Sequence, residues 1–384
     1  MEHTSWDAFW WDSITGPHTV VQQVAMSLME NKMVALKVPS DLPWRHSMRS
    51  EIQMTFNERT DVRDVIIESI DAVDDGLDTA DPGQFLLQRY ASPSVRAGYR
   101  AKARKTIQSY LSDWKVLRNR IIWIKGLDGE TARKWFQFCR EFTPRATETG
   151  LFLLEYHGDF TPPEAKHFTY IDFHQFVSLY DVQLFNSFFL DEEQQYTNIW
   201  KRYIAVTAAA LCETDAEVSE QLLLHTDFHT ETILEGLQHV VDSGELDKRG
   251  MEQNSRHPLW YLRNGRPDEL LRRVWTAQIQ VLFPVIELER RNFVEKSWDA
   301  IHESLEQYSV KQFGTVLHDP AEVELGTLCY MMNYKTATGT RMLYIPEDAD
   351  RQRIHFLHSC RNKLAHMNCC TPNEISVLLD NAAI

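Results

Sequence analysis

The sequence predicts an α/β module with a mostly parallel sheet, followed by an all-helical region and a C-terminal helix bundle. Two observations support this fold class. Up to about residue 170, short apolar runs alternate with amphipathic stretches. Beyond that residue, apolar side chains recur at spacings of three and four, which is typical of amphipathic helices. Strands that alternate with helices favour a parallel sheet with helices on both faces.

The first part of the chain is expected to hold four strands. Pro17 opens a helix in its first turn, and apolar residues at helical spacing continue it to Leu28. A buried strand follows and ends at Pro39, which cannot donate to a sheet. The predicted strands cover 33–39, 64–71, 119–127 and 150–158, with helices near 44–56 and 129–142.

Two stretches rich in turn formers divide the chain into three predicted domains. They are "FTPPEAKHFT" and "GMEQNSRHPLWYLRNGRP". The first domain is α/β (1–170), the second is a helical middle with a segment that fits a winged helix near 200–248 (171–266), and the third is a helix bundle (267–384). Pro284 predicts a kink in a long helix. Further helices are predicted at 198–212, 218–224, 230–244, 267–293, 319–332, 348–366 and 371–380.

Composition and charge predict a cytoplasmic protein without disulfides. The formal net charge of −15 argues against non-specific wrapping of long nucleic acid. Six Cys without CxxC spacing indicate free thiols in a reducing compartment. No basic and apolar leader begins the chain, and no apolar run approaches the ~18 residues of a membrane span, so neither a signal peptide nor a membrane contact is expected.

One segment, residues 96–120, is basic although the chain as a whole is acidic. It holds eight Lys and Arg side chains and one Asp. A solvated helix face and a strip that contacts nucleic-acid phosphates both fit this pattern. In the second interpretation, the contacts come from Arg100, Lys102, Arg104 and Lys105.

The first predicted strand does not lead into a phosphate-binding loop. Such a loop needs glycines, whose backbone N–H groups wrap the phosphates, and a GK[ST] end. Here "SDLPWRHSMRSEI" has no glycine, and Pro43 removes a donor. The third strand ends without an acidic Mg²⁺ ligand, although Asp128 follows closely. We therefore expect no ATP hydrolysis and no cofactor.

The order of these elements and the segments "ITGP" and "ALKVP" resemble STAND-type and AAA-type NTPases. The resemblance covers about residues 6–170 and is greatest to the inactive STAND modules of prokaryotic conflict systems, which lack the phosphate loop. It implies a module that senses or restrains rather than hydrolyses. An unrelated α/β scaffold is the alternative.

The predicted helix 348–366 carries polar residues in its last two turns. Asn362 and His366 are four residues apart and share a face. Arg361 falls at the margin of the apolar stripe, where a charge is costly unless it is paired or faces another chain. The stripe consists of Ile354, Leu357, Cys360 and Leu364.

The pattern R-N-x-x-x-H at 361–366 resembles the motif of the HEPN superfamily (higher eukaryotes and prokaryotes nucleotide-binding). Flanking helices support it: Asp319 is a predicted N-cap, and Thr371 with Glu374 has capping-box spacing. The resemblance implies a metal-independent endoribonuclease in which His366 transfers protons, Arg361 binds the phosphate and Asn362 orients the site. It also implies a site formed across a homodimer.

Two alternatives stay open beside the ribonuclease. In one, the domain keeps the motif but serves as a non-enzymatic adaptor, scaffold or sensor in a multi-protein defence or signalling complex. In the other, the bundle is unrelated, Arg361 pairs with Glu324, and His366 caps the helix end. The expected function is therefore that of a bacterial defence component whose partners are RNA, other proteins of the complex and a second copy of the chain.

A possible metal site at His225, Asp227 and His229 is the weaker candidate. Two His four residues apart can bind zinc, but a third ligand and the general-base Glu of HExxH are absent. A solvated polar turn is the favoured interpretation, and no metal is expected.

Overall fold

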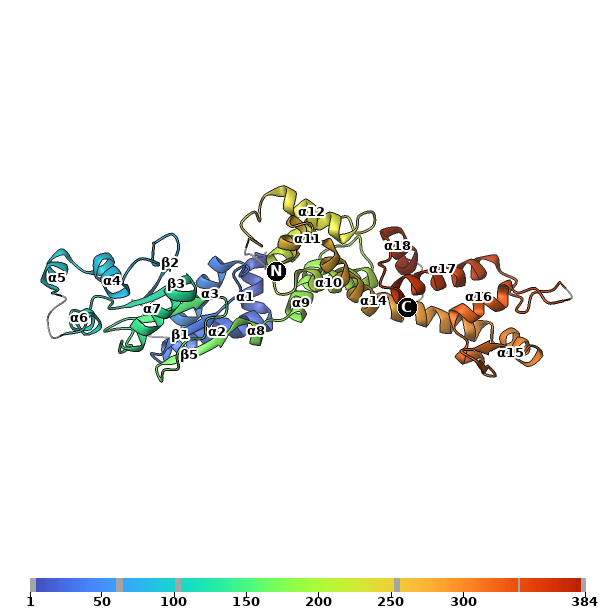
Figure 1. Cartoon of the computed structure of the whole chain (residues 1–384), viewed down its shortest axis with the longest axis horizontal. Coiled ribbons are helices and arrows are strands. Elements are labelled where there is room, and N and C mark those ends of the chain that lie inside the picture. Colours follow the sequence, from blue (N-terminus) through green and yellow to red (C-terminus); the bar gives the residue numbers. More distant parts are fainter. Residues whose placement is uncertain (1–4, 60–64, 101–104, 252–255, 338, 381–384) are drawn as a thin grey trace. The chain divides into compact units, whose positions relative to one another are not determined.

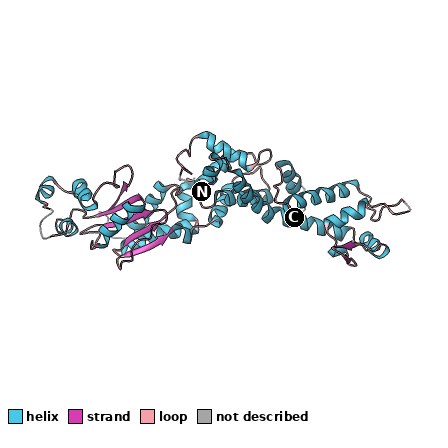
Figure 2. Cartoon of the chain, in the orientation of Figure 1, coloured by secondary structure: helices cyan, strands magenta, loops and turns pink. Residues whose placement is uncertain are grey.

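The computed structural model contains two compact units (Figure 1). One comprises residues 1–185 with 214–217, and the other comprises 186–213 with 218–384. An α/β module followed by a mostly helical region, the predicted fold class, is confirmed (Figure 2). The residues that the structure describes are 5–59, 65–100, 105–251, 256–337 and 339–380.

The sheet of the first unit has five parallel strands in the order β2-β3-β4-β1-β5. A fifth strand, β5 (Phe168–Asp172), is absent from the sequence prediction and pairs with β1. It contains residue 170, so the predicted end of the α/β domain falls inside the sheet. The four predicted strands are present as β1 (Met33–Lys37), β2 (Ile66–Asp71), β3 (Arg120–Leu127) and β4 (Leu151–Tyr156).

Helices cover both faces of this sheet. Successive side chains of a strand point to opposite faces, so Met33 and Ala35 of β1 belong to one core layer and Val34 and Leu36 to the other. The layer of Met33 includes side chains of α4 (Pro82–Tyr90), α6 (Ile107–Asp113) and α7 (Gly129–Arg140). The helices α1 (Trp6–Ser13), α2 (Thr15–Met29) and α3 (Arg45–Arg59) pack together, with α2 against β1 and α3 against β2. Short helices α5 (Pro93–Gly98) and α8 (Phe173–Phe176) complete the unit.

One edge of the sheet is covered by side chains of α3. In edge strand β2, the backbone N–H of Ile67 donates to Gln53 Oε1 (2.9 Å). The carbonyl of the same residue accepts from Arg49 Nη2 (3.1 Å). Both backbone groups of Ile67 that face away from β3 are therefore satisfied by helix side chains, as buried or edge backbone groups require.

The second unit is built around the long helix α14 (Pro267–Lys296), which contains Pro284. This helix packs against α10, α17 and α18. Helix α9 (Leu179–Asp191) begins in the first unit and ends in the second. The other helices are α10 (Asn198–Cys212), α11 (Ala216–His225), α12 (Ile233–Ser243), α13 (Pro258–Arg263), α15 (Trp298–Gln307), α16 (Leu325–Asn333), α17 (Asp348–Ala365) and α18 (Pro372–Asp380).

The start of α18 has the predicted capping box. Thr371 Oγ1 accepts from the backbone N–H of Glu374 (3.4 Å), and Glu374 Oε2 accepts from the backbone N–H of Thr371 (2.8 Å). Glu374 also pairs with Lys363 of α17 at 2.5 Å. The cap therefore joins the start of α18 to the end of α17.

Some details of the second unit differ from the sequence prediction. The helix predicted at 319–332 is split: Asp319 caps a single 3-10 turn, and α16 begins at Leu325. A two-residue hairpin joins β6 (Lys311–Gln312) to β7 (Thr315–Val316). Residues 200–248, all of them described, hold helices and no strand. The winged helix that the sequence predicts for this segment stays a prediction. Along the described parts of the chain, no helix is long and apolar enough to cross a lipid bilayer.

Candidate functional site

The segment between β1 and α3 is held in place by side chains of the first unit. It stands where a P-loop NTPase has its phosphate loop. The backbone N–H of Trp44 donates to Glu217 Oε2 (2.8 Å), and the Trp44 carbonyl accepts from Trp11 Nε1 (3.1 Å). Trp44 has a φ of 41°, which a non-glycine residue keeps only where its surroundings hold it. These contacts tie the end of the segment to Trp11 of α1 and to Glu217.

A buried ion pair lies between the start of α3 and the sheet. Arg45 Nη2 is 3.0 Å from Glu155 Oε1, and the Glu155 side chain is 1% exposed. Trp123 Nε1 of β3 donates to the other carboxylate oxygen (3.0 Å). Burial raises the pKa of Glu155, while Arg45 and Trp123 favour its charged form. The guanidinium of Arg45, the first residue of α3, is therefore paired with a buried carboxylate of the sheet.

Three carboxylates contact the first turn of α3 and the residue before it. A helix N-terminus attracts anions, and phosphate sites use this property. Here the anions are carboxylates of the chain: Asp7 accepts from the Ser47 hydroxyl, Glu155 binds Arg45 and Glu217 binds the Trp44 amide. The groups at the start of α3 that could bind an anion are therefore already engaged by carboxylates of the chain, and the absence of ATP hydrolysis stays a prediction.

The motif residues of the second unit lie at the C-terminal end of α17. Arg361 and Asn362 belong to the last two turns and are half-buried. His366 is the C-cap residue and is exposed, and its backbone N–H donates to the Asn362 carbonyl (3.0 Å). The three predicted site residues are thus close along one helix end, with the imidazole of His366 open to solvent.

The side chain of Asn362 contacts a histidine that the sequence analysis did not select. Asn362 Nδ2 lies 3.0 Å from His358 Nε2, and Arg361 Nη1 donates to Asn362 Oδ1 (3.4 Å). A guanidinium can only donate, so the Asn362 oxygen faces Arg361 and its NH₂ group faces His358. His358 Nε2 is therefore the acceptor, and a neutral ring carries its proton on Nδ1.

His358 is held in the neutral form by its surroundings. Burial lowers its pKa, and the positive charge of Arg361 and the neighbouring His355 lower it further. Gly326 of α16 makes room for this ring, because a Cβ atom there would stand 3.3 Å from His358 Nε2. A neutral imidazole can accept a proton, which is the property required of a general base.

Arg361 also faces a carboxylate of the neighbouring helix. Its Nη2 atom is 3.6 Å from Glu324 Oε2, the alternative partner that the sequence suggested. The two side chains are 35% and 43% exposed, so this is a surface pair. Exposed pairs of this kind contribute ~1 kcal/mol or less. The cost expected for a desolvated guanidinium at an apolar margin therefore does not arise, and Arg361 is accessible to a ligand.

The turn after α17 fixes the end of the helix. Met367 has a left-handed φ of 61°, and the backbone N–H of Asn368 donates to the Lys363 carbonyl (2.9 Å). This is the Schellman arrangement, in which glycine is usual at the position of Met367. Trp275 Nε1 of α14 donates to the Leu364 carbonyl (2.7 Å). The backbone next to His366 is thus anchored, although its side chain is exposed.

In its described parts, the basic segment of the first unit includes the end of α5, the whole of α6 and the first residue of β3. Arg100 is exposed. Lys105 pairs with Asp113 at 2.6 Å, and both side chains are exposed, so the pair is weak. Lys102 and Arg104 lie outside the described residues. The nucleic-acid interpretation of these four residues stays a prediction.

The segment with His225, Asp227 and His229 forms a polar turn. Asp227 accepts hydrogen bonds from the His229 amide (3.1 Å) and from Thr230 Oγ1 (2.7 Å). The ring of His229 stacks on Tyr196, with centroids 5.2 Å apart. Asp227 is thus engaged within the turn, and the His229 ring packs on Tyr196 outside it. Across the described ranges, no group of three His, Cys, Asp or Glu side chains is arranged to hold a metal ion.

Compared with models of known protein families, the chain matches none, and no curated protein matches it significantly. Its function therefore has to follow from its own residues and their geometry.

Proposed function

We propose that the C-terminal helices form a metal-independent endoribonuclease, in which Arg361, Asn362 and His366 are the site residues. The observation that carries the proposal is their arrangement at the end of α17. A guanidinium, an amide and an exposed imidazole lie within six residues, beside a second, neutral imidazole at His358. This is the set of groups that RNA cleavage by its own 2′-hydroxyl needs.

The proposed reaction assigns one task to each group. A neutral imidazole removes the proton of the 2′-hydroxyl, whose oxygen attacks the adjacent phosphorus. The bond to the 5′-oxygen breaks as an acid donates a proton to it, leaving a cyclic phosphate and a 5′-hydroxyl. His366 is the proton-transfer residue because its ring is exposed. Arg361 stabilises the charge on the phosphate, and Asn362 holds His358 and Arg361 in position.

The resemblance to HEPN domains further suggests that two copies of α17 complete one site. A single imidazole cannot serve as base and acid for the same phosphate at the same moment, so a second histidine is needed. It comes either from His358 or from His366 of a second copy of the chain. In a symmetric dimer the same patch of both copies meets at the axis.

For the first unit we propose a sensing or restraining role of the inactive STAND type. This rests on the contacts that replace a phosphate loop after β1, above all the pair of Arg45 with Glu155. The unit would act in the cytoplasm by binding a partner protein of a bacterial defence system.

A non-enzymatic adaptor is the second candidate, and the contact between Arg361 and Glu324 favours it. This carboxylate lies 3.6 Å from the Arg361 guanidinium and offsets the positive charge that would bind a phosphate. If the pair is structural, the motif maintains the helix end and the bundle serves only to bind other proteins.

Cleavage of a mixed RNA ladder in the presence of EDTA distinguishes the two functions. The ribonuclease predicts that His366→Ala and Arg361→Ala lose cleavage by about 10²-fold or more and keep the unfolding midpoint of the wild type. His302→Ala is the matched control, because His302 is a similarly exposed histidine of α15. Glu324→Gln should raise cleavage, since it removes the competing charge.

The adaptor predicts a different pattern. Wild type, His366→Ala and His302→Ala would then leave the RNA equally intact. Arg361→Ala would lower the stability of the bundle, and Glu324→Gln would lower it by a similar amount.

A further inference from the structure

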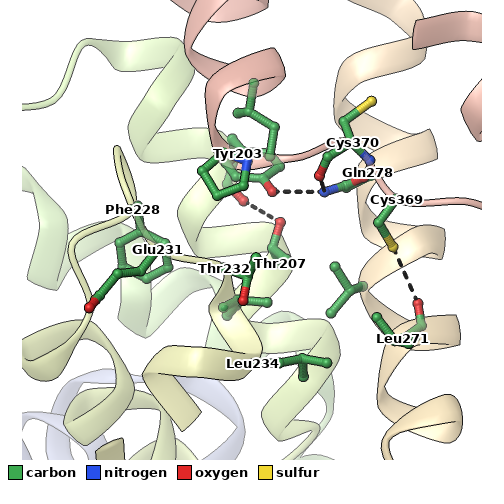
Figure 3. Close-up of a pocket in the computed structure, with 14 residues that line it drawn as sticks. Tyr203, Thr207, Phe228, Glu231, Thr232, Leu234, Leu271, Gln278, Cys369 and Cys370 are labelled. Atoms are coloured by element: carbon green, nitrogen blue, oxygen red, sulfur yellow. Dashed lines mark hydrogen bonds between the residues drawn. The ribbon is translucent and has the colours of Figure 1, made fainter. Parts of the chain in front are cut away.

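A cavity lies among the helices of the second unit (Figure 3). Its walls come from α10, α12, α14, α18, the turn before α12 and the segment that joins α17 to α18. About 560 Å³ is free of atoms, and part of this space is open to solvent. An apolar cavity of about 150 Å³ is large enough for benzene. The enclosed part of this cavity is smaller than that, so a bound ring would occupy the interior and the open mouth together.

One end of the cavity is polar. The side-chain amide of Gln278 donates to the Tyr203 hydroxyl (3.1 Å) and to the Cys370 carbonyl (3.2 Å), and its oxygen accepts from the Cys370 amide (2.7 Å). Figure 3 shows these groups together. Tyr203 is 5% exposed and Gln278 is 2% exposed. Burial raises the pKa of Tyr203, so this side chain stays a neutral phenol that can donate its own proton.

Most of the remaining lining is apolar, with Thr207 and Thr232 as neutral polar members, and its one charged member among the described residues is acidic. Leu234, Val274 and Ile375 line the walls. Glu231 lies at the edge, with its side chain 32% exposed. No Lys or Arg belongs to the lining among the described residues. A carboxylate or phosphate would therefore meet negative charge without a cation to offset it, which is unfavourable.

We propose that this cavity binds a small neutral molecule with an apolar body about the size of a benzene ring and one hydroxyl or amide group. The body packs against Val274 and Leu234, and the polar group bonds to the Tyr203 hydroxyl. Small-molecule sites are commonly built this way, from mostly apolar walls with a few convergent polar groups between helices. The inference is independent of the proposed ribonuclease.

The segment after α17 forms part of the cavity wall. Cys369 and Cys370 line the cavity and follow His366 by three and four residues. The backbone of Cys370 is tied to Gln278 on the cavity wall. A bound molecule would therefore pack against this segment as well as against α14, and it would add to the stability of the folded state, as any ligand that binds only that state does.

The test uses phenol as the probe, with ligand-observed NMR titration of the full chain. Phenol should bind saturably with a dissociation constant on the order of 1 mM. Benzoate, the anion of similar size, should bind at least tenfold more weakly. Val274→Phe fills the cavity and should abolish phenol binding. Leu288→Phe is the matched control, because Leu288 is an exposed residue of the same helix and should leave the affinity unchanged.

A second variant keeps the test decisive if Val274→Phe fails to fold. Tyr203→Phe removes only the hydroxyl and should weaken phenol about tenfold while changing the affinity for toluene by less than twofold. The proposal is overturned if phenol does not saturate the wild type, if folded Val274→Phe binds phenol as the wild type does, or if benzoate binds as tightly as phenol. Equal loss of phenol and toluene in Tyr203→Phe would overturn the role of the hydroxyl.

Discussion

Replacement of Arg45 by Met should destabilise the first unit by about 3 kcal/mol at pH 7. Glu155 is 1% exposed and would keep only the hydrogen bond from Trp123. Removal of one partner of a buried ion pair costs about 3–5 kcal/mol. The lower end applies because the Arg45 side chain is 29% exposed, so water can reach its end of the pair. Glu155→Gln keeps an acceptor for Trp123 and leaves only the accessible Arg45 alone, so it should cost about 1 kcal/mol or less.

The sign of the pH dependence follows from the raised pKa of Glu155. A folded carboxyl with a raised pKa adds stability that is fully present below its ordinary pKa and lost as the pH rises through the folded value. Without Arg45 that pKa rises further, so the cost of Arg45→Met should shrink from pH 7 to pH 5. Urea unfolding followed by tryptophan fluorescence measures both quantities. A loss below about 0.5 kcal/mol at pH 7, or an equal loss at both pH values, would refute the buried charge pair.

Three further outcomes are expected. Thr371→Ala removes the N-cap of α18 and should cost about 1 kcal/mol; an unchanged melting temperature would mean that the cap contributes nothing. Met367→Gly relieves a left-handed φ and should add about 1 kcal/mol, whereas Met367→Ala should not, and equal effects in thermal unfolding would contradict this reasoning. If the basic segment binds nucleic acid, charge reversal to Glu should weaken binding and flatten its salt dependence. Equal binding by the wild type and the variant at every salt concentration would exclude that role. The reversed residues are Arg100, Lys102, Arg104 and Lys105.

The strength of the apolar signal decided which strands the sequence could predict. Every residue of β4 is buried, and its first four residues, Leu151 to Leu154, form an apolar run before Glu155. Strand β5 lies at the edge of the sheet and buries only Phe168 and Ile171. Its sequence follows paired prolines and contains Thr169 and Tyr170, which gives neither a clear run nor strict alternation. Pairing with β1, about 135 residues earlier in the chain, makes it a strand.

In the candidate site, only the contacts between residues that are close in sequence could be predicted. The i, i+4 spacing that joins Asn362 to His366 equally joins His358 to Asn362, so His358 could have been found from the sequence. The position of Glu324 beside Arg361 depends on how α16 packs on α17, although the sequence offered this residue as a partner. The pair of Arg45 with Glu155 joins residues 110 positions apart and needs the sheet to bring them together.

The side chains of α3 that bind Ile67 also limit how the sheet can grow. An exposed edge strand is a template on which another chain can add a strand, and this is a common route to aggregation. At β2 an incoming strand would first have to displace Arg49 and Gln53 from both backbone groups of Ile67. The helix thus occupies the hydrogen-bonding position of a sixth strand, and the sheet is protected at this edge from polymerising through its backbone.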